Sequence, residues 1–184
     1  MRVERKRKNL RLVSWDYSAS GYYFVTICTK ERGEILCRDL HTPCRGAHCA
    51  PAQQPTIQFP LSHIGEVVQN AICEIPRRYP SVFVDKYVIM PNHIHIILAL
   101  TDVDYHGRAL RAPTVSRLVN QMKGYVTKQL GFSIWQKSFY DHIIRDKEEY
   151  LRIWQYIDTN PLKWELDCYY DTGFHEIAQK GRNL

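Results

Sequence analysis

The sequence predicts an α+β fold in which helices cover an antiparallel sheet mainly on one face. Runs rich in β-branched and aromatic residues are typical of strands, and they lie at 21–30, 81–90 and 93–100. Segments with apolar residues every three to four positions are typical of amphipathic helices, and they lie at 62–75, 115–130 and from about 146 onwards. The order β, α, β, β, α, short strand or loop, α is that of a layered α+β domain. We expect one domain over residues 1–184.

The first half of the chain contains one predicted strand, one loop insertion and one helix. The strand is "GYYFVTICTK" at 21–30, and the segment 38–60 that follows has four prolines and no apolar period, which predicts a loop. The helix should begin after Ser62, a residue type that favours the N-cap, and should end at Pro76. Its apolar stripe runs from Ile64 to Ile75.

The second half begins with two strands, 81–90 and 93–100, joined by the turn-like dipeptide Pro91-Asn92. A helix is predicted from about Val115 to Leu130, and a last helix should begin near Asp146 and stop before Pro161. No apolar run approaches the ~18–20 residues of a membrane span. No apolar signal segment follows the basic start either, so we expect a soluble, cytoplasmic protein with no membrane partner.

Positive charge is concentrated at the N-terminus. The formal net charge is +6, and residues 1–11 carry most of it. A short basic arm beside a nearly neutral domain suits contact with a phosphate backbone, and the alternative is a solubilising tail. The arm residues that we expect to contact DNA are Arg5, Lys6, Arg7, Lys8 and Arg11.

Two histidines interrupt one of the most apolar segments, "YVIMPNHIHIILAL". His93 and His95 are two residues apart on a predicted strand, so both side chains project from the same face. Two neutral imidazoles at this spacing can bind one divalent metal. The alternative is that one of them is a hydrogen-bonded core residue. We favour the metal.

The last helix offers partners for such a metal. Tyr156 and Asn160 are four residues apart and therefore share a helix face. Asn160 can supply an amide oxygen near the negative end of the helix dipole, and Tyr156 can present its phenol beside it. The alternative is that Asn160 is a helix C-cap and Tyr156 packs in the core. Spacing alone leaves both open.

Four segments together resemble the REP-associated tyrosine transposases, relatives of the single-tyrosine HUH transposases of small insertion sequences. The segments are "GYYFVTICTK", "YVIMPNHIHIILAL", "WQKSFYDHIIRD" and "YLRIWQYIDTNP". The resemblance runs from about Arg7 to Trp164. It implies a ferredoxin-like sheet with His93 and His95 as metal ligands and Tyr156 as the nucleophile. Asn160 is implied as the third ligand, where related insertion-sequence enzymes have glutamine, also an amide-oxygen donor.

The resemblance implies a DNA strand transferase that cleaves and rejoins single-stranded hairpins, such as REP-like repeats, through a 5′-phosphotyrosine. Its cofactor would be Mg²⁺ or Mn²⁺. The rival hypotheses are a metal-dependent phosphodiesterase that activates water, and a non-catalytic nucleic-acid-binding relative. Monomer and homodimer both stay open.

Other residues are candidates for DNA contact. Lys123 and Arg145 are cations suited to phosphates, although Arg145 has Glu148 and Glu149 as alternative partners. The remaining candidates for contact with bases or phosphates are Trp135, Tyr140 and His142. Packing in the core is the alternative for Trp135 and Tyr140, and we favour it for Trp135. Separately, His41, Cys44, His48 and Cys49 are zinc-type ligands without ordinary zinc spacing, so we expect a surface loop there.

Overall fold

A computed structural model describes residues 16, 19–38, 44–46, 56–102 and 113–166 of the chain. Its centre is a four-stranded antiparallel sheet in the order β4-β5-β1-β6. The strands are β1 (Gly21–Cys28), β4 (Val82–Ile89), β5 (His93–Leu100) and β6 (Tyr140–Ile144). With a helix after β1 and another after β5, the chain follows the β-α-β-β-α-β order of a ferredoxin-like fold. The predicted fold class is confirmed.

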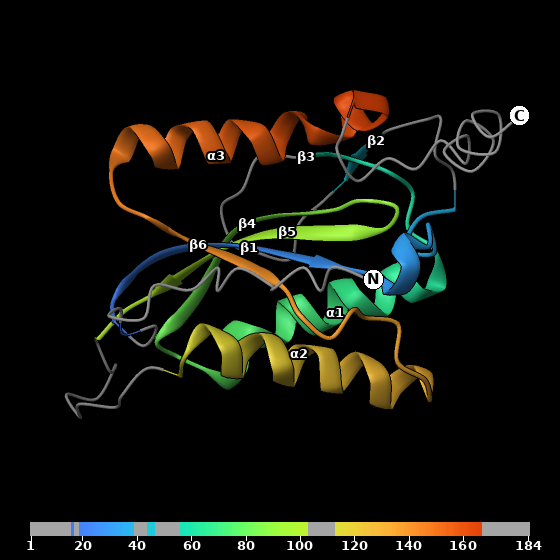
Figure 1. Cartoon of the computed structure of the whole chain (residues 1–184), viewed down its shortest axis with the longest axis horizontal. Helices are drawn as coiled ribbons and strands as arrows, with labels where there is room; N and C mark the ends of the chain where they lie inside the picture. The colour runs from blue at the N-terminus through green and yellow to red at the C-terminus, as the bar shows by residue number, and fades with distance from the viewer. Residues whose placement is uncertain (1–15, 17–18, 39–43, 47–55, 103–112, 167–184) are drawn as a thin grey trace, which may run out of the picture.

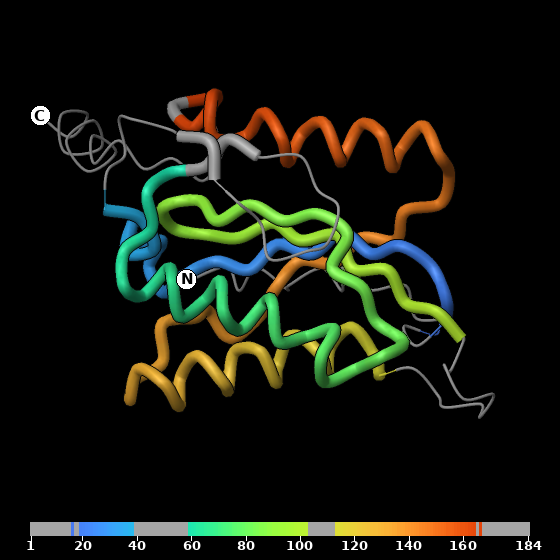
Figure 2. The backbone as a smooth tube through the Cα atoms, turned by 180° about the vertical axis from the view of Figure 1, so that it is seen from behind, coloured from blue at the N-terminus to red at the C-terminus, as the bar shows by residue number. Residues whose placement is uncertain are grey.

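The helices lie on both faces of this sheet. Helices α1 (His63–Arg78) and α2 (Val115–Leu130) run side by side beneath one face, as predicted for most of the helical layer. Helix α3 (Lys147–Thr159) crosses the other face, and both views separate it from α1 and α2 by the sheet (Figures 1 and 2). The histidine-bearing face of the sheet therefore lies under α3, away from the α1–α2 layer.

Strand β5 is the most enclosed element. It pairs with β1 on one side and β4 on the other, and all eight of its residues are buried. Ile94, Ile96 and Leu98 point to the α1–α2 side, where they join the main hydrophobic cluster. The alternate residues His93 and His95 point to the α3 side.

Helix ends follow local chemistry, with one correction. The Ser62 hydroxyl accepts from the Gly65 N–H at 3.1 Å, which confirms the predicted N-cap of α1. The prediction that α1 ends at Pro76 is wrong, because α1 continues to Arg78. Proline lacks an N–H and disturbs the turn before it, yet the helix continues for two residues, so Pro76 lies inside the last turn.

The predicted bounds of α2 are confirmed, and α3 begins after Asp146 as predicted, with that side chain accepting from Glu149 N–H at 2.8 Å. Helix α3 itself ends before Pro161, but a 3₁₀ helix (η2, Asn160–Leu166) continues the chain through that proline. Asn160 keeps right-handed helical angles at the junction.

The segment 38–60 is not loop throughout. Its described parts contain two short strands, β2 (Cys44–Gly46) and β3 (Thr56–Gln58), which pair antiparallel. Prolines and the absence of an apolar period concealed them, since three residues are too few to show alternation. Of the four zinc-type residues, three lie outside the described residues, and only the backbone of Cys44 is described.

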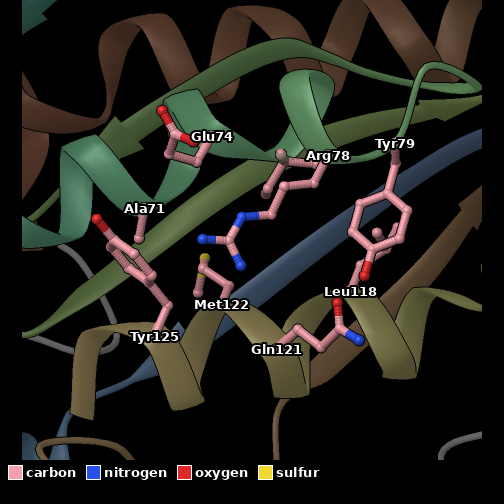
Figure 3. Close-up of a pocket in the computed structure, with 9 residues that line it drawn as sticks. Ala71, Glu74, Arg78, Tyr79, Leu118, Gln121, Met122 and Tyr125 are labelled. Carbon is pink, nitrogen blue, oxygen red and sulfur yellow. The ribbon is translucent and has the colours of Figure 1, made fainter. Parts of the chain in front are cut away.

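A small hollow marks the seam between α1 and α2 (Figure 3). Arg78 of α1 lies over the ring of Tyr125 on α2, with its guanidinium carbon 5.1 Å from the ring centroid. The hollow measures about 20 Å³, which is room for roughly one water molecule. The α1–α2 layer is therefore closely packed here. Among the described residues, no helix is both long and apolar enough to cross a membrane.

Candidate functional site

The two histidines of β5 lie side by side, as the strand period predicted. Their Nε2 atoms are 3.0 Å apart and their ring centroids 4.5 Å apart. Both residues are almost fully buried, at 0% and 1% exposure. The two imidazoles therefore form a single buried polar cluster in an otherwise apolar strand.

Asn92, in the hairpin turn between β4 and β5, orients His93. The Asn92 Nδ2 group donates to the Arg32 carbonyl at 3.2 Å, which turns the Asn92 Oδ1 atom towards His93 Nδ1 at 2.8 Å. An amide oxygen only accepts, so His93 Nδ1 carries the hydrogen and Nε2 presents its lone pair. Burial, and then the positive charge of Arg32, lower the pKa of His93 to about 3. His93 is therefore neutral at physiological pH.

Two residues of β1 orient His95. Thr26 Oγ1 lies 2.8 Å from His95 Nδ1, and the Phe24 ring stacks on the imidazole at 5.2 Å and 26°. A hydroxyl both donates and accepts, so Thr26 can serve either tautomer of His95. When Nδ1 donates to Thr26, the Nε2 lone pairs of both histidines face the same point.

Helix α3 brings Tyr156 to this point. Its phenol oxygen is 3.2 Å from His95 Nε2, and the Phe24 ring meets it edge-on at 6.3 Å. Tyr156 is 41% exposed. The phenol thus reaches the histidine pair while one side of the ring stays open to a large molecule.

Polar contacts hold α3 on the sheet. Within the helix only Ile157 is fully buried, whereas α1 and α2 each bury five residues. The buried Lys86 of β4 bonds Asp158 at 2.7 Å, and its ammonium lies 3.4 Å from the ring centroid of Trp154. The Tyr150 hydroxyl donates to Asp85 Oδ2 at 2.6 Å. These bonds fix the helix that carries Tyr156.

Asn160 lies on the same side of the helical segment as Tyr156. It is buried, at 3% exposure, and it stands four residues after Tyr156 and four before Trp164. Tyr156 meets His95, and the ring of Trp164 is 6.0 Å from that of His93. Asn160 keeps helical angles four residues after Tyr156, and it therefore belongs to the helix face that covers the histidine pair.

The two Nε2 atoms are placed so that both could bind one divalent ion with short metal–ligand distances. Two ligands at right angles, each about 2.1 Å from an ion, are about 3.0 Å apart, and this matches the Nε2–Nε2 distance. Within the described ranges, no three His, Cys, Asp or Glu side chains come together to hold a metal. A third protein ligand here would be of another type, and the Asn160 amide oxygen is one that hard cations accept.

The other predicted contact residues are scattered. The Lys123 ammonium donates to the carbonyls of Gln136 and Ser138, at 2.9 and 3.1 Å, on the α2 side of the sheet. The side chain of Arg145 is exposed at the end of β6, and only its backbone N–H bonds Glu149. DNA contact by either residue stays a prediction. The basic arm, residues 1–11, lies outside the described residues.

The aromatic and histidine candidates near β6 have different environments. Trp135 is buried, at 3% exposure, which favours packing. His142 Nε2 bonds Glu149 Oε1 at 2.7 Å, so Glu149 serves His142 and the Arg145 backbone. Tyr140 is exposed.

Sequence reasoning missed the residues that support the site. Thr26 and Phe24 are separated from the histidines by a long stretch of chain, and only the strand register joins them. Lys86 is close in sequence, but its partner Asp158 is not. One signal was present: Lys86 interrupts the apolar run "VFVDKYVIM", and a lysine there implies a buried charge with a partner.

The chain is similar in sequence to several known proteins. No family model matches the chain. An uncharacterised protein of Haemophilus influenzae is 31% identical over 182 residues, covering 89% of this chain and 93% of its own. A protein of Escherichia coli named REP-associated tyrosine transposase is 28% identical over 99 residues, which is 53% of this chain and 54% of that one.

One solved structure shares the fold. It is described as a REP-associated tyrosine transposase bound to a REP hairpin, and it superposes with a TM-score of 0.57. The match covers 84% of this chain and 74% of the other, at 22% identity.

The names of the sequence relatives support a transposase-like role for the chain, and the solved structure shows that it shares their kind of fold. Within that class, the chain is similar to proteins named REP-associated tyrosine transposase, including the Escherichia coli protein and a second protein of Haemophilus influenzae that is 25% identical over 155 residues and is named a putative member.

Proposed function

We propose that the protein is a metal-dependent DNA strand transferase that cleaves and rejoins single-stranded hairpin DNA, with Tyr156 as the nucleophile. The observation that carries the proposal is the 3.2 Å approach of the Tyr156 phenol to His95, at the buried histidine pair. Had α3 placed Tyr156 elsewhere, the pair would lack a nucleophile. Its 41% exposure leaves room for a strand to approach.

The proposed reaction is a transesterification. The Tyr156 oxygen attacks the scissile phosphorus, a new P–O bond forms to tyrosine, and the bond to the 3′-oxygen of the upstream nucleotide breaks. The phenol proton leaves to water, and the departing 3′-oxygen takes up a proton. The products are a 5′-phosphotyrosine and a 3′-hydroxyl. Attack by another 3′-hydroxyl reverses the step and joins a new strand, so no ATP is consumed.

We assign His93, His95 and Asn160 as ligands of Mg²⁺ or Mn²⁺. When bound, the ion would neutralise the phosphate oxygens and favour ionisation of the phenol. Asn92 and Thr26 hold the two imidazoles in place, and Phe24 packs against both His95 and Tyr156. These contacts keep the reacting groups aligned before DNA arrives.

Hairpin DNA is the proposed partner, because the solved relative is described as bound to a REP hairpin. The surface offers exposed cations and aromatic rings near α3, among them Arg145 and Tyr140. Cations neutralise phosphates, and rings stack on unpaired bases. The basic arm would add phosphate contacts.

The test is covalent capture. The protein is mixed with a single-stranded hairpin oligonucleotide, labelled at its 3′ end, with Mg²⁺ or Mn²⁺, and run on a denaturing gel. We expect the label to move to the protein, and we expect Tyr156→Phe or a chelator to abolish this. Tyr125→Phe is the matched control, since Tyr125 lies on α2 beyond the sheet.

Two outcomes would favour the rivals. Cleavage that survives Tyr156→Phe would indicate a phosphodiesterase that activates water. Binding without cleavage under either metal would indicate a non-catalytic relative.

A further inference from the structure

A pair of tyrosines lies on the α3 side of the sheet, away from the histidines. Tyr22 of β1 and Tyr150 of α3 meet edge-to-face, with ring centroids 5.2 Å apart and planes at 64°. Tyr22 shares a strand face with Phe24 and Thr26, the residues that support His95. The pair therefore belongs to the same surface as the proposed reaction site.

A cavity of about 420 Å³ opens at this pair. That volume lies within the range of small-molecule sites, roughly 300–1,000 Å³, and far exceeds the hollow between α1 and α2. Its lining residues are Tyr22, Ile144, Arg145, Asp146, Lys147 and Tyr150. A single nucleobase fits such a space.

One wall of the cavity is rigid and the other is open. The hydroxyl of Tyr150 donates to Asp85 Oδ2 at 2.6 Å, which fixes its ring. Tyr22 is 43% exposed, so its ring is available for contact. A fixed ring beside an exposed one is a platform for stacking, which costs little ordering on binding.

The charges at the rim suit a polyanion. Arg145 and Lys147 are exposed cations on either side of Asp146. The carboxylate of Asp146 caps α3 through the Glu149 N–H, and Glu149 in turn bonds His142. Both carboxylates thus have partners within the protein, while the two cations extend into solvent. Among the charged residues that line the cavity, two cations stand against one carboxylate, so a phosphate at the rim would meet net positive charge there.

The distance to Tyr156 matches a short run of DNA. From Tyr150 to Tyr156 the helix rises about 9 Å, and from Tyr22 to Thr26 the strand spans about 13 Å. A stacked strand advances about 3.4 Å per nucleotide. The cavity therefore lies about three to four nucleotides from the bond at Tyr156.

We propose that this cavity binds one unpaired base of the substrate strand, with its face on the exposed ring of Tyr22 and its edge against Tyr150, and with Arg145 and Lys147 on the flanking phosphates. The inference rests on the proposed function and deepens it: the enzyme would hold its strand at two points, the scissile phosphate and a base a few nucleotides away. A free phosphate would need no aromatic rings, which is why a nucleotide is the favoured occupant.

The experiment scans a hairpin oligonucleotide with single abasic sites, placed at successive positions around the cleavage site, and measures binding by fluorescence anisotropy. For the wild type, we expect one position, three to four nucleotides from the cleaved bond, to weaken binding about 5- to 100-fold. Tyr22→Leu should weaken binding of intact DNA by a similar factor and should lose no further affinity at that position. Tyr22→Trp should restore the wild-type pattern.

Phe132→Ala is the matched control, an exposed aromatic residue just beyond α2 that should keep the full abasic penalty. If Tyr22→Leu kept the full wild-type loss of affinity at the sensitive position, the inference would be overturned. Covalent capture by the wild type without any sensitive position would overturn it too. Binding without covalent capture would refute the proposed chemistry, and the abasic scan would then still test the base site by itself. No binding of single-stranded DNA would overturn both.

Discussion

Lys86 is the buried charge under the helix that carries Tyr156, and changing it or its partner tests how that helix is held. The Lys86 side chain is 2% exposed, whereas that of Asp158 is 38% exposed. The two members of this ion pair therefore differ in their access to water. Replacing each in turn should have unequal effects on the free energy of unfolding.

Asp158→Asn leaves an ammonium without its carboxylate in a site that water barely reaches. Removing one partner of a fully buried pair costs about 3–5 kcal/mol. This cost is reduced because Asp158 is partly exposed and because Lys86 keeps its contact with Trp154 at 3.4 Å. We therefore expect Asp158→Asn to lower the free energy of unfolding by about 2 kcal/mol. Lys86→Met removes the buried charge and leaves a carboxylate that water can solvate. We expect Lys86→Met to lower the free energy of unfolding by about 1 kcal/mol or less.

Urea unfolding measures this difference. With a slope of roughly 2 kcal/mol per M, Asp158→Asn should lower the midpoint by about 1 M, and Lys86→Met by no more than half of that. The double variant should resemble Lys86→Met, because no stranded charge remains. Hydrogen exchange should show faster opening of α3 in Asp158→Asn, with α1 unchanged.

Equal losses in the two single variants would refute this reasoning, since they would mean that burial of Lys86 does not decide the cost. A larger loss in Lys86→Met would point instead to packing of the lysine stem against Trp154.

Three further predictions concern local features. A Cβ at Gly65 would lie 2.1 Å from the Leu36 carbonyl oxygen, so Gly65→Ala should lower the free energy of unfolding by about 2 kcal/mol or more. Gly124 has open space around it at an exposed point of α2, so Gly124→Ala should raise the free energy of unfolding by about 0.5–1 kcal/mol. Urea unfolding measures both. Ser62→Ala should cost about 1 kcal/mol through loss of the α1 N-cap, measured as a lower Tm. Burial, and then the hydrogen bond to Asp85, raise the pKa of Tyr150 above its usual value of about 10, so its stabilising contribution is present below pH 10 and is lost above it. Relative to Tyr150→Phe, the wild type should therefore lose stability only above pH 10, and a parallel pH profile of the two would contradict this.

The elements of the sheet and helices were predictable because their patterns are local. Alternation across β5 placed both histidines on one face, and a four-residue spacing placed Tyr156 and Asn160 on one side of α3. Ser62 predicted the start of α1, because serine is a residue type that favours the N-cap. In each case the signal lies within a few residues of the feature.

What could not be predicted depends on register and layering. Nothing near Lys86 indicates that Asp158 lies above it, because that contact exists only once α3 crosses the sheet. Thr26 meets His95 because β1 pairs antiparallel with β5 in one register, and a shift by one residue would put an isoleucine or valine there. Pro76 predicted a helix end but lies inside the last turn of α1, because the backbone tolerated the loss of one bond.

The most direct test of the proposed chemistry is the site of the covalent adduct. The protein is incubated with hairpin DNA and Mg²⁺ or Mn²⁺, the products are digested with protease and nuclease, and the peptides are read by mass spectrometry. We predict a nucleotide linked through its 5′-phosphate to Tyr156, and no adduct in Tyr156→Phe. An adduct on another residue, or strand cleavage by wild-type protein without any adduct, would contradict the proposal that Tyr156 beside His93 and His95 is the nucleophile.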